Sequence, residues 1–191
     1  KALPTLFFEF HGSEISNKES IKIVEELSKN NNGSDFKWAE SIEERNKLWK
    51  ARHDVYYSVK ALGQNMKVYS TDICVPVSKL VECISWAEKE VKDKGLIAPM
   101  VGHVGDGNFH SIILYDPNDK EKQKLIREYS DRLIDKALEL EGTITGEHGI
   151  GLQKKHYLLK EHFDNLPVMK SIKRSLDPNN IMNPGKVFDL N

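Results

Sequence analysis

The apolar and polar positions of this chain follow two periods, one typical of helices and one typical of strands. Helical stretches repeat apolar residues every three or four positions, whereas strand-like stretches cluster or alternate β-branched and aromatic residues. The pattern predicts helices over residues 16–29, 42–59, 77–94, 121–140, 154–161 and 167–176. It predicts strands over residues 5–11, 36–39, 67–75, 98–104 and 108–115.

These elements predict an α+β fold, in which an antiparallel sheet is packed against helices on one face. The antiparallel pairing follows from GHVGDGNFH, residues 102–110, which has a short glycine-containing turn between two strand-like runs. With Asp106 and Gly107 at the centre of a two-residue turn, His103 would lie directly opposite His110. The second face of the sheet would then be available for a partner.

Composition describes an ordinary globular chain. Of its 191 residues, 39% are hydrophobic and 30% are charged, and the formal net charge is −1. This balance gives no electrostatic reason to expect nucleic-acid binding. The longest apolar runs are far shorter than the ~20 residues of a membrane-spanning helix. Two cysteines, Cys74 and Cys83, are too few for a disulfide scaffold, so we expect both to pack as free thiols.

The first residues, KALPTLFFEF, contain no initiator methionine, no signal peptide and no Arg-rich transit segment. They enter strand-like sequence almost at once. We therefore expect the chain to begin inside a longer protein, with any targeting segment in the other part.

Two short segments carry residues that suit a metal ion. If His103 and His110 face each other, their Cβ atoms lie roughly 4.5–5.5 Å apart, and both rings can bind one ion at about 2.0–2.1 Å. In TGEHGIG, residues 145–151, Glu147 and His148 are adjacent, so in an extended segment their side chains point opposite ways. Two histidines and one carboxylate leave coordination positions open, which favours a catalytic or substrate-binding ion over a structural zinc.

Simpler interpretations stay open at this point. A single histidine is more often a packing or surface group than a ligand, and TGEHGIG could be a flexible turn. Its glycine spacing is also weakly similar to a phosphate-binding loop, but it lacks the Lys-Ser/Thr pair and a preceding βαβ unit. Glycines 146, 149 and 151 would allow close backbone approach or unusual backbone angles.

Three motifs together resemble one known family. GHVGDGNFH, TGEHGIG and DPNNIMNPGKVF, in this order and at these separations, resemble the C-terminal domain of FAD-linked oxidases. The resemblance is strongest to the D-lactate dehydrogenase (cytochrome) type, which is related to D-2-hydroxyglutarate dehydrogenase and the glycolate oxidase flavin subunit. PTLFFEFHGS and MKVYSTDICVPVSKL are similar as well, so the resemblance extends over residues 1–191 almost completely.

The resemblance implies a ferredoxin-like cap domain that holds substrate over FAD, with the N-terminal FAD-binding domain outside this chain. It implies that the metal ligands are His103, His110 and Glu147, with zinc or manganese as the ion. It also implies that His148 takes the hydroxyl proton of the substrate while hydride leaves the α-carbon for the flavin.

Further residues match substrate and flavin positions of that family. Arg52, in LWKARHD, matches the carboxylate-binding arginine, whose fork suits a 2-hydroxy acid. Lys67 matches a position near the substrate, and Tyr56, one helical turn beyond Arg52, would line the same pocket. Asn183 and Lys186, in the tail IMNPGKVF, would contact the flavin.

The expected function is oxidation of D-lactate to pyruvate by hydride transfer to FAD. Ile112 occupies the position, two after His110, where relatives that take dicarboxylates carry a polar residue, so a small acid is favoured. D-2-hydroxyglutarate and glycolate remain alternative substrates, and a non-catalytic metal-binding module or a self-contained metal hydrolase remain alternative classes. The resemblance implies an acceptor such as cytochrome c and a mitochondrial location. Residues 1–191 alone are expected to be inactive.

Overall fold

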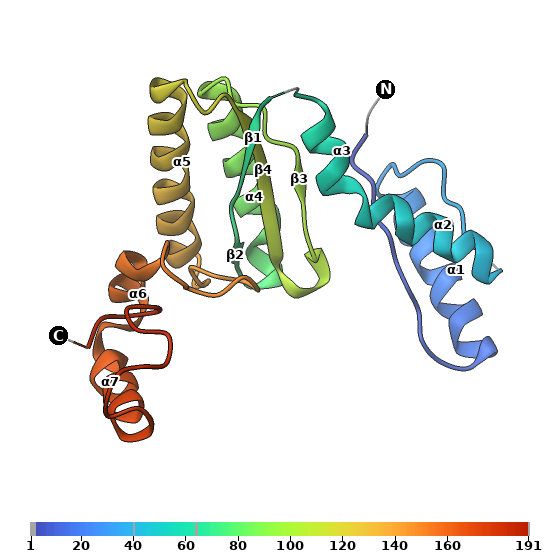
Figure 1. Cartoon of the computed structure of the whole chain (residues 1–191). Helices are drawn as coiled ribbons and strands as arrows, with labels where there is room; N and C mark the ends of the chain where they lie inside the picture. Colours follow the sequence, from blue (N-terminus) through green and yellow to red (C-terminus); the bar gives the residue numbers. More distant parts are fainter. Residues whose placement is uncertain (1–2, 40, 64, 191) are drawn as a thin grey trace. The chain divides into compact units, whose positions relative to one another are not determined.

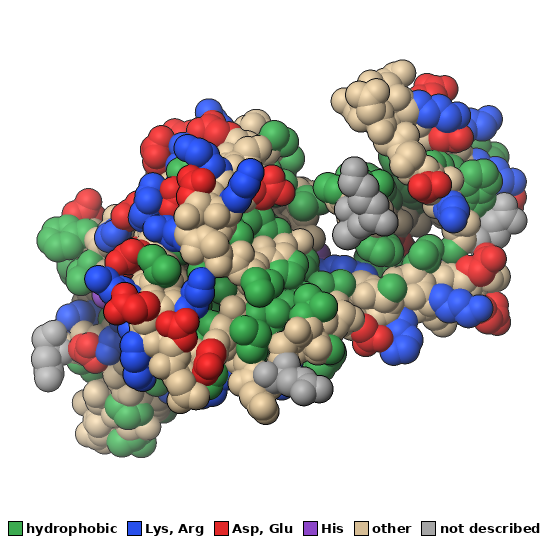
Figure 2. Space-filling view, turned by 90° about the horizontal axis from the view of Figure 1, so that it is seen from above, with side chains coloured by type: hydrophobic (Ala, Val, Ile, Leu, Met, Phe, Trp, Pro, Cys, Tyr) green, Lys and Arg blue, Asp and Glu red, His purple; other side chains and the backbone are tan. Residues whose placement is uncertain are grey.

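The computed structural model describes residues 3–39, 41–63 and 65–190 (Figure 1). Close contacts divide the chain into two compact units, Lys1–Val55 and Tyr56–Asn191, which we describe separately. None of the helices in the described ranges has the length and apolar character needed to span a bilayer. Figure 2 shows Lys and Arg side chains interspersed with Asp and Glu, as the net charge of −1 leads one to expect.

The first unit contains helices α1 (Glu14–Asn30) and α2 (Ile42–His53). Each begins at a serine whose hydroxyl accepts a hydrogen bond from a backbone N–H group that has no partner within the helix. Ser13 accepts from the Ser16 N–H group, and Ser41 forms a reciprocal capping box with Glu44. These caps fix the helix starts and confirm the helix predicted over residues 16–29.

The strands predicted over residues 5–11 and 36–39 are wrong. Both segments are irregular, because a strand needs a neighbour for its backbone groups, and no strand of the described chain pairs with them. Side chains hold the first segment instead. Glu9 accepts a hydrogen bond from Nε of Arg45 in α2 at 2.8 Å, and the rings of Phe8 and Phe10 stack with centroids 6.3 Å apart.

The helix predicted over residues 42–59 is two helices. α2 ends at His53, and α3 (Val55–Ala61) begins after Asp54. The residues at the break, Asp-Val-Tyr-Tyr, are all poor helix formers, which is the physical reason for the division. Arg52 and Tyr56 therefore do not lie on one continuous helix, and the spacing argument that placed them on a shared face does not hold.

The second unit is built around strand β4 (Asn108–Tyr115), which pairs antiparallel with the three other strands of the described residues. β1 (Lys67–Ser70) and β2 (Ile73–Cys74) pair with successive parts of β4 in one register, so they form a single strand interrupted at residues 71–72. β3 (Met100–Val101) pairs with β4 along its other edge.

The predicted hairpin register is wrong. Val101, not His103, lies opposite His110. In place of a two-residue turn, a turn of 3₁₀ helix, η1 (Val104–Asp106), is followed by Gly107 at φ 80°. The predicted turn needs positive φ at both central residues. The helical turn instead lets the Asp106 N–H group donate to the His103 carbonyl oxygen at 2.9 Å.

Helices α4 (Val77–Asp93) and α5 (Lys120–Glu139) pack together and cover one face of the sheet (Figure 1). The main core lies between them and β4. Its fully buried members include Cys83, Phe109, Ile113, Tyr129 and Leu133. The predicted α+β class, with helices on one sheet face, is confirmed. α6 (Lys155–His162), η2 (Phe163–Asn165) and α7 (Leu166–Leu176) follow.

A buried hydroxyl pair fastens α5 to β4. The hydroxyl groups of Tyr129 and Ser111 lie 2.7 Å apart, and burial raises the pKa of Tyr129 to about 12. Tyr129→Phe should lower the free energy of unfolding by about 1–2 kcal/mol, because it leaves the Ser111 hydroxyl buried without its partner. Urea unfolding measures the loss. Adding Ser111→Ala to Tyr129→Phe should recover part of the lost stability. Equal stability of the single and double variants would show that the unpaired Ser111 hydroxyl is not the cause of the loss.

Candidate metal site

Glu147 lies at the centre of a group of three histidines near the start of β4. Its Oε1 atom is 2.8 Å from Nε2 of His110 and 3.8 Å from Nε2 of His148. Its other oxygen, Oε2, is 3.9 Å from Nε2 of His103. The histidines come from β4, from the segment before η1 and from the loop after α5, so the fold joins three separate parts of the chain.

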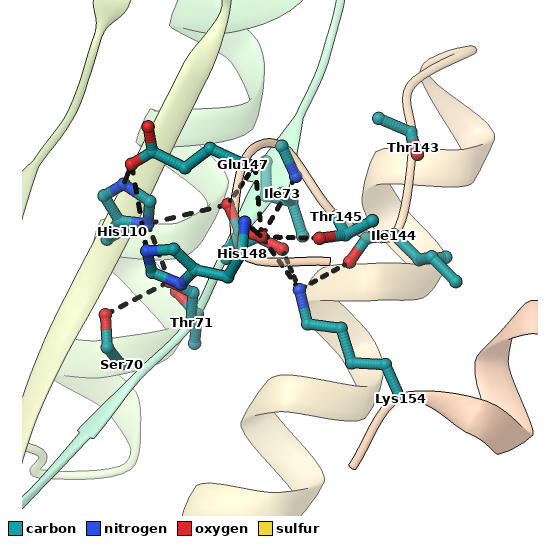
Figure 3. Close-up of polar contacts among 12 residues, drawn as sticks. Ser70, Thr71, Ile73, His110, Thr143, Ile144, Thr145, Glu147, His148 and Lys154 are labelled. Atoms are coloured by element: carbon teal, nitrogen blue, oxygen red, sulfur yellow. Dashed lines mark hydrogen bonds and ion pairs between the residues drawn. The ribbon is translucent and has the colours of Figure 1, made fainter. Parts of the chain in front are cut away.

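His110 has a fixed ring orientation. It lies on β4 between Phe109 and Ser111, so its side chain points to the face opposite the α4–α5 core. The ring is buried, and Nδ1 lies 2.9 Å from the carbonyl oxygen of Thr71. Because a carbonyl can only accept, Nδ1 carries the hydrogen and donates it. Nε2 is thereby directed at Glu147, as Figure 3 shows.

The ring of His148 stacks on that of His110, with centroids 4.8 Å apart and an angle of 7° between the planes. The two rings differ in exposure. His110 is buried, whereas the His148 side chain is 51% exposed. One ring of the stack is therefore held inside the fold, and the other is accessible to a small molecule.

Asp72 holds the loop that carries Glu147 and His148. Its side chain is 1% exposed, and its carboxylate accepts hydrogen bonds from six donors. The donors are the Thr145 hydroxyl at 2.7 Å, the N–H groups of Gly146, Glu147 and His148 at 3.1 Å each, the Asn108 amide at 3.1 Å and the Lys154 ammonium at 3.0 Å.

The ammonium group of Lys154 is hydrogen-bonded as completely as the Asp72 carboxylate. It also donates to the Asp72 carbonyl oxygen at 2.8 Å and to the Ile144 carbonyl oxygen at 3.0 Å (Figure 3). Burial alone raises the pKa of Asp72, but the hydrogen bonds from Thr145 and His148 and the nearby Lys154 outweigh it and hold the pKa well below its usual range. Asp72 is therefore a charged, fully bonded carboxylate.

The donor set of the site suits a divalent cation. Imidazole nitrogens and carboxylate oxygens bind zinc at about 2.0–2.2 Å, so two such ligands on one ion lie roughly 3 Å apart. The 2.8 Å separation of Glu147 Oε1 from Nε2 of His110 matches this requirement, whereas Oε2 lies 3.9 Å from Nε2 of His103, which is longer. Asp72, His110 and His148 also offer possible ligand atoms within 4.8 Å of one another.

Comparison with known proteins identifies the family of the chain. The family described as FAD linked oxidases, C-terminal domain, matches residues 1–187. The chain belongs to this family. A relative of this FAD-linked oxidase domain, the "Probable D-lactate dehydrogenase, mitochondrial" of Danio rerio, is 50% identical over 98% of the chain and 38% of its own length. The "D-lactate dehydrogenase [cytochrome], mitochondrial" of Arabidopsis thaliana is 42% identical over 97% of the chain and 33% of its own length.

More distant proteins share the domain. The "Glycolate oxidase subunit GlcD" of Bacillus subtilis is 29% identical over 98% of the chain and 40% of its own length. A solved structure, 4-ethylphenol oxidase from Gulosibacter chungangensis, covers 93% of this chain with a TM-score of 0.63 at 18% identity, which shows the shared fold. That match covers 38% of the oxidase chain. The FAD-linked oxidase domain thus spans little more than a third of these proteins.

Of the other residues that the sequence singled out, Lys67 lies apart from the histidines. Lys67 pairs with Tyr115 at the far end of β4 from His110, roughly 17 Å along the strand at about 3.4 Å per residue. Near the C-terminus, Lys186 donates to Oδ1 of Asn183 at 3.1 Å, and both side chains are exposed. The tail returns to the glycine-rich loop, since the Val187 N–H group donates to the Gly151 carbonyl oxygen at 2.8 Å.

Two predicted substrate residues fall on either side of the sequence boundary between the units. Arg52 lies in α2 of the first unit, and Tyr56 begins the second. The Tyr56 ring meets that of Tyr57 edge-on, with centroids 5.6 Å apart. The substrate-binding roles of Arg52, Tyr56 and Lys67 stay predictions, as do the flavin contacts of Asn183 and Lys186.

Sequence reasoning missed the residues that hold the site together, namely Asp72, Asn108 and Lys154. One signal was present. Asp72 is the single charge in the mainly apolar run TDICVPV, and a charge in such a run has to be paired when the strand is buried. Its partners, 36 to 82 residues further along the chain, could not be read from local sequence.

Proposed function

We propose that this FAD-linked oxidase domain is the substrate- and metal-binding part of a flavin-dependent D-2-hydroxyacid dehydrogenase that oxidises D-lactate to pyruvate. The observation that carries the proposal is the Glu147 carboxylate, placed within 4 Å of three imidazoles. The curated relatives at 50% and 42% identity, both named D-lactate dehydrogenases, support this substrate.

In this proposal His103, His110 and Glu147 hold zinc or manganese, leaving coordination positions for substrate. A bound divalent ion polarises a coordinated hydroxyl group and lowers its pKa, and FAD, held mainly by another domain, accepts the hydride. The hydrogen bond from His110 to Thr71 keeps Nε2 available as a ligand.

His148 takes the proton of the substrate hydroxyl. Its ring is half-exposed, so a small acid can approach it, and its stacking on His110 fixes the plane of the imidazole beside the ligand atoms. A general base has to lie within hydrogen-bond reach of the proton it removes. Its position beside the proposed metal ligands supports this role.

Other residues would determine which 2-hydroxy acid is the substrate. We keep the guanidinium fork of Arg52, which suits a carboxylate, as the proposed partner of the substrate carboxylate. Lys67 and Tyr56 stay proposed substrate residues, and Asn183 and Lys186 stay proposed flavin contacts. Ile112, buried two positions after His110, offers no partner for a second carboxylate. This favours D-lactate over D-2-hydroxyglutarate, with glycolate as a further candidate.

The names of the relatives support a proposal for partners and location. Several are named mitochondrial, and the cytochrome in the name of the Arabidopsis protein supports cytochrome c as electron acceptor. A second partner is the N-terminal FAD domain of the same protein. We propose both for this chain.

The metal site can be tested on the purified chain. Elemental analysis and titration with Zn²⁺ and Mn²⁺ should show one tightly bound ion, because the Glu147 carboxylate lies within 4 Å of both His103 and His110. His103→Ala and Glu147→Ala should each weaken binding by more than about tenfold, since each removes a ligand. His11→Ala, which alters a histidine of the first unit, is the matched control and should bind as wild type does. Equal affinity in all four proteins would refute the site.

The reaction is tested in the flavoprotein that carries this domain. D-lactate should reduce a dye acceptor faster than D-2-hydroxyglutarate or glycolate, and His148→Ala should lower kcat far more than it weakens metal binding. Residues 1–191 alone should be inactive with all three acids. Metal binding without oxidation of any 2-hydroxy acid would favour a non-catalytic binding module, and hydrolytic activity of the chain alone would favour a hydrolase.

A further inference from the structure

Asp72 interrupts a strand to bind a loop. It lies between β1 and β2, where the strand pairing with β4 is broken, and turns its carboxylate into the protein. Three consecutive backbone N–H groups, those of Gly146, Glu147 and His148, converge on that carboxylate together with the Thr145 hydroxyl. Successive N–H groups that point to one anion form a concave binding site of the kind called a nest.

The carboxylate of Asp72 is not suited to bind a metal itself. Its six hydrogen bonds occupy the positions that a cation would need. The Lys154 ammonium lies 3.0 Å from Oδ2 and would repel a divalent ion at the same oxygen. Although Asp72 lies close to His110 and His148, three of its six hydrogen bonds run to the backbone of the loop.

The loop conformation determines where the two functional side chains go. Glu147 and His148 are adjacent, and both backbone N–H groups are bound to the same carboxylate. Fixing two successive peptide groups fixes the directions of both Cα–Cβ bonds. Glu147 then reaches His110, and the His148 ring lies on the His110 ring. Lys154 holds the approach to the loop through the Ile144 carbonyl oxygen.

We propose that Asp72 is the positioning residue of the metal site, whose carboxylate acts as an internal anion that sets the Thr145–His148 loop in its ligand-presenting conformation. The proposal rests on the proposed function, because it assigns Glu147 to the metal and His148 to the substrate. Asp72 acts through the loop and touches neither ion nor substrate. Lys154 balances its charge.

The test compares three variants of the full chain. Asp72→Asn keeps the shape of the side chain, but its amide N–H₂ group faces the N–H, hydroxyl and ammonium groups that donate to the Asp72 carboxylate. Asp72→Asn with Lys154→Met removes both charges and so removes the unpaired ammonium. Asp177→Asn is the matched control. Asp177 is another buried aspartate that accepts from two backbone N–H groups, of Ile181 and Met182, and from one lysine, but its loop contains none of the candidate ligands.

Three readouts separate the proposal from a purely structural role. Amide hydrogen exchange of residues 146–148 should accelerate by about tenfold or more in both Asp72 variants, and Zn²⁺ affinity should fall by about 10–100-fold. The visible spectrum of bound Co²⁺, which reports coordination geometry, should change in the same variants. Asp177→Asn should leave all three measurements near wild type.

The double variant guards against simple unfolding. If Asp72 served only to pair with Lys154, removing both charges would restore the exchange rates and the Zn²⁺ affinity, and that result would overturn the proposal. Unchanged amide exchange in folded Asp72→Asn would overturn it as well. If the wild-type chain binds no divalent ion, the proposed metal site fails, and amide exchange still decides whether Asp72 sets the loop.

Discussion

Gly146→Ala should abolish tight metal binding and lower the free energy of unfolding by about 1–3 kcal/mol, the usual cost of overpacking. A Cβ atom at this position would lie 1.8 Å from Nδ2 of Asn108 and 2.9 Å from Oδ1 of Asp72. Neither neighbour can withdraw easily, because both are buried and hydrogen-bonded to each other. The loop has to move instead, and Glu147 moves with it.

Zn²⁺ titration and urea unfolding measure the two effects. Gly105→Ala is the matched control, since Gly105 lies in the other glycine-containing motif and its added Cβ would meet nothing within 4 Å. It should bind Zn²⁺ as wild type does and change stability by less than about 0.5 kcal/mol. If Gly146→Ala bound Zn²⁺ normally, the close packing of the loop on Asp72 would not be what positions Glu147.

The glycines of the second motif show how far sequence reasoning can reach. TGEHGIG predicted that its glycines serve close approach or unusual backbone angles, and both occur. Gly146 packs against side chains that leave no room for a Cβ atom, while Gly149 and Gly151 have φ of 75° and 52°. Glycine spacing therefore predicted the local backbone, although it could not tell which glycine serves which purpose.

The hairpin shows the opposite case. Long helices with clear periodicity, such as α4 and α5, were predicted to within one or two residues. The turn between β3 and β4 was not, because Asp-Gly fits more than one tight turn. Here Gly107 packs so closely on the end of β2 that a Cβ atom would lie 1.9 Å from the Val75 carbonyl oxygen. This long-range contact selects the turn, and with it the strand register.

His103 and His110 nevertheless approach the same carboxylate, for a reason that the hairpin argument did not contain. The prediction relied on cross-strand pairing within one hairpin. The structure instead brings Glu147 between them from a loop more than thirty positions away. Asp72 makes that possible, and because all its partners are distant in sequence, only the tertiary fold reveals its role.

Stability of the chain should decrease on acidification, and much of that decrease should vanish in Asp72→Asn. The hydrogen bonds and the Lys154 ammonium that surround Asp72 hold its folded-state pKa below the unfolded value of about 3.9. As the pH falls below about 4, the unfolded chain takes up the proton first. The stabilisation from ionised Asp72 is therefore complete above that pH and is lost as the pH falls toward the folded-state pKa.

At pH 7, Asp72→Asn should be less stable than wild type by about 3 kcal/mol or more, because it leaves Lys154 buried without its counterion. Between pH 5 and the acidic pH at which the chain unfolds, the free energy of unfolding of Asp72→Asn should change less with pH than that of wild type. The variant lacks one group whose pKa differs between the folded and unfolded states. Part of the slope should persist, because the Lys173 ammonium likewise lowers the pKa of Asp177. Urea unfolding at a series of pH values gives both curves, and parallel curves for the two proteins would show that Asp72 carries no such linkage.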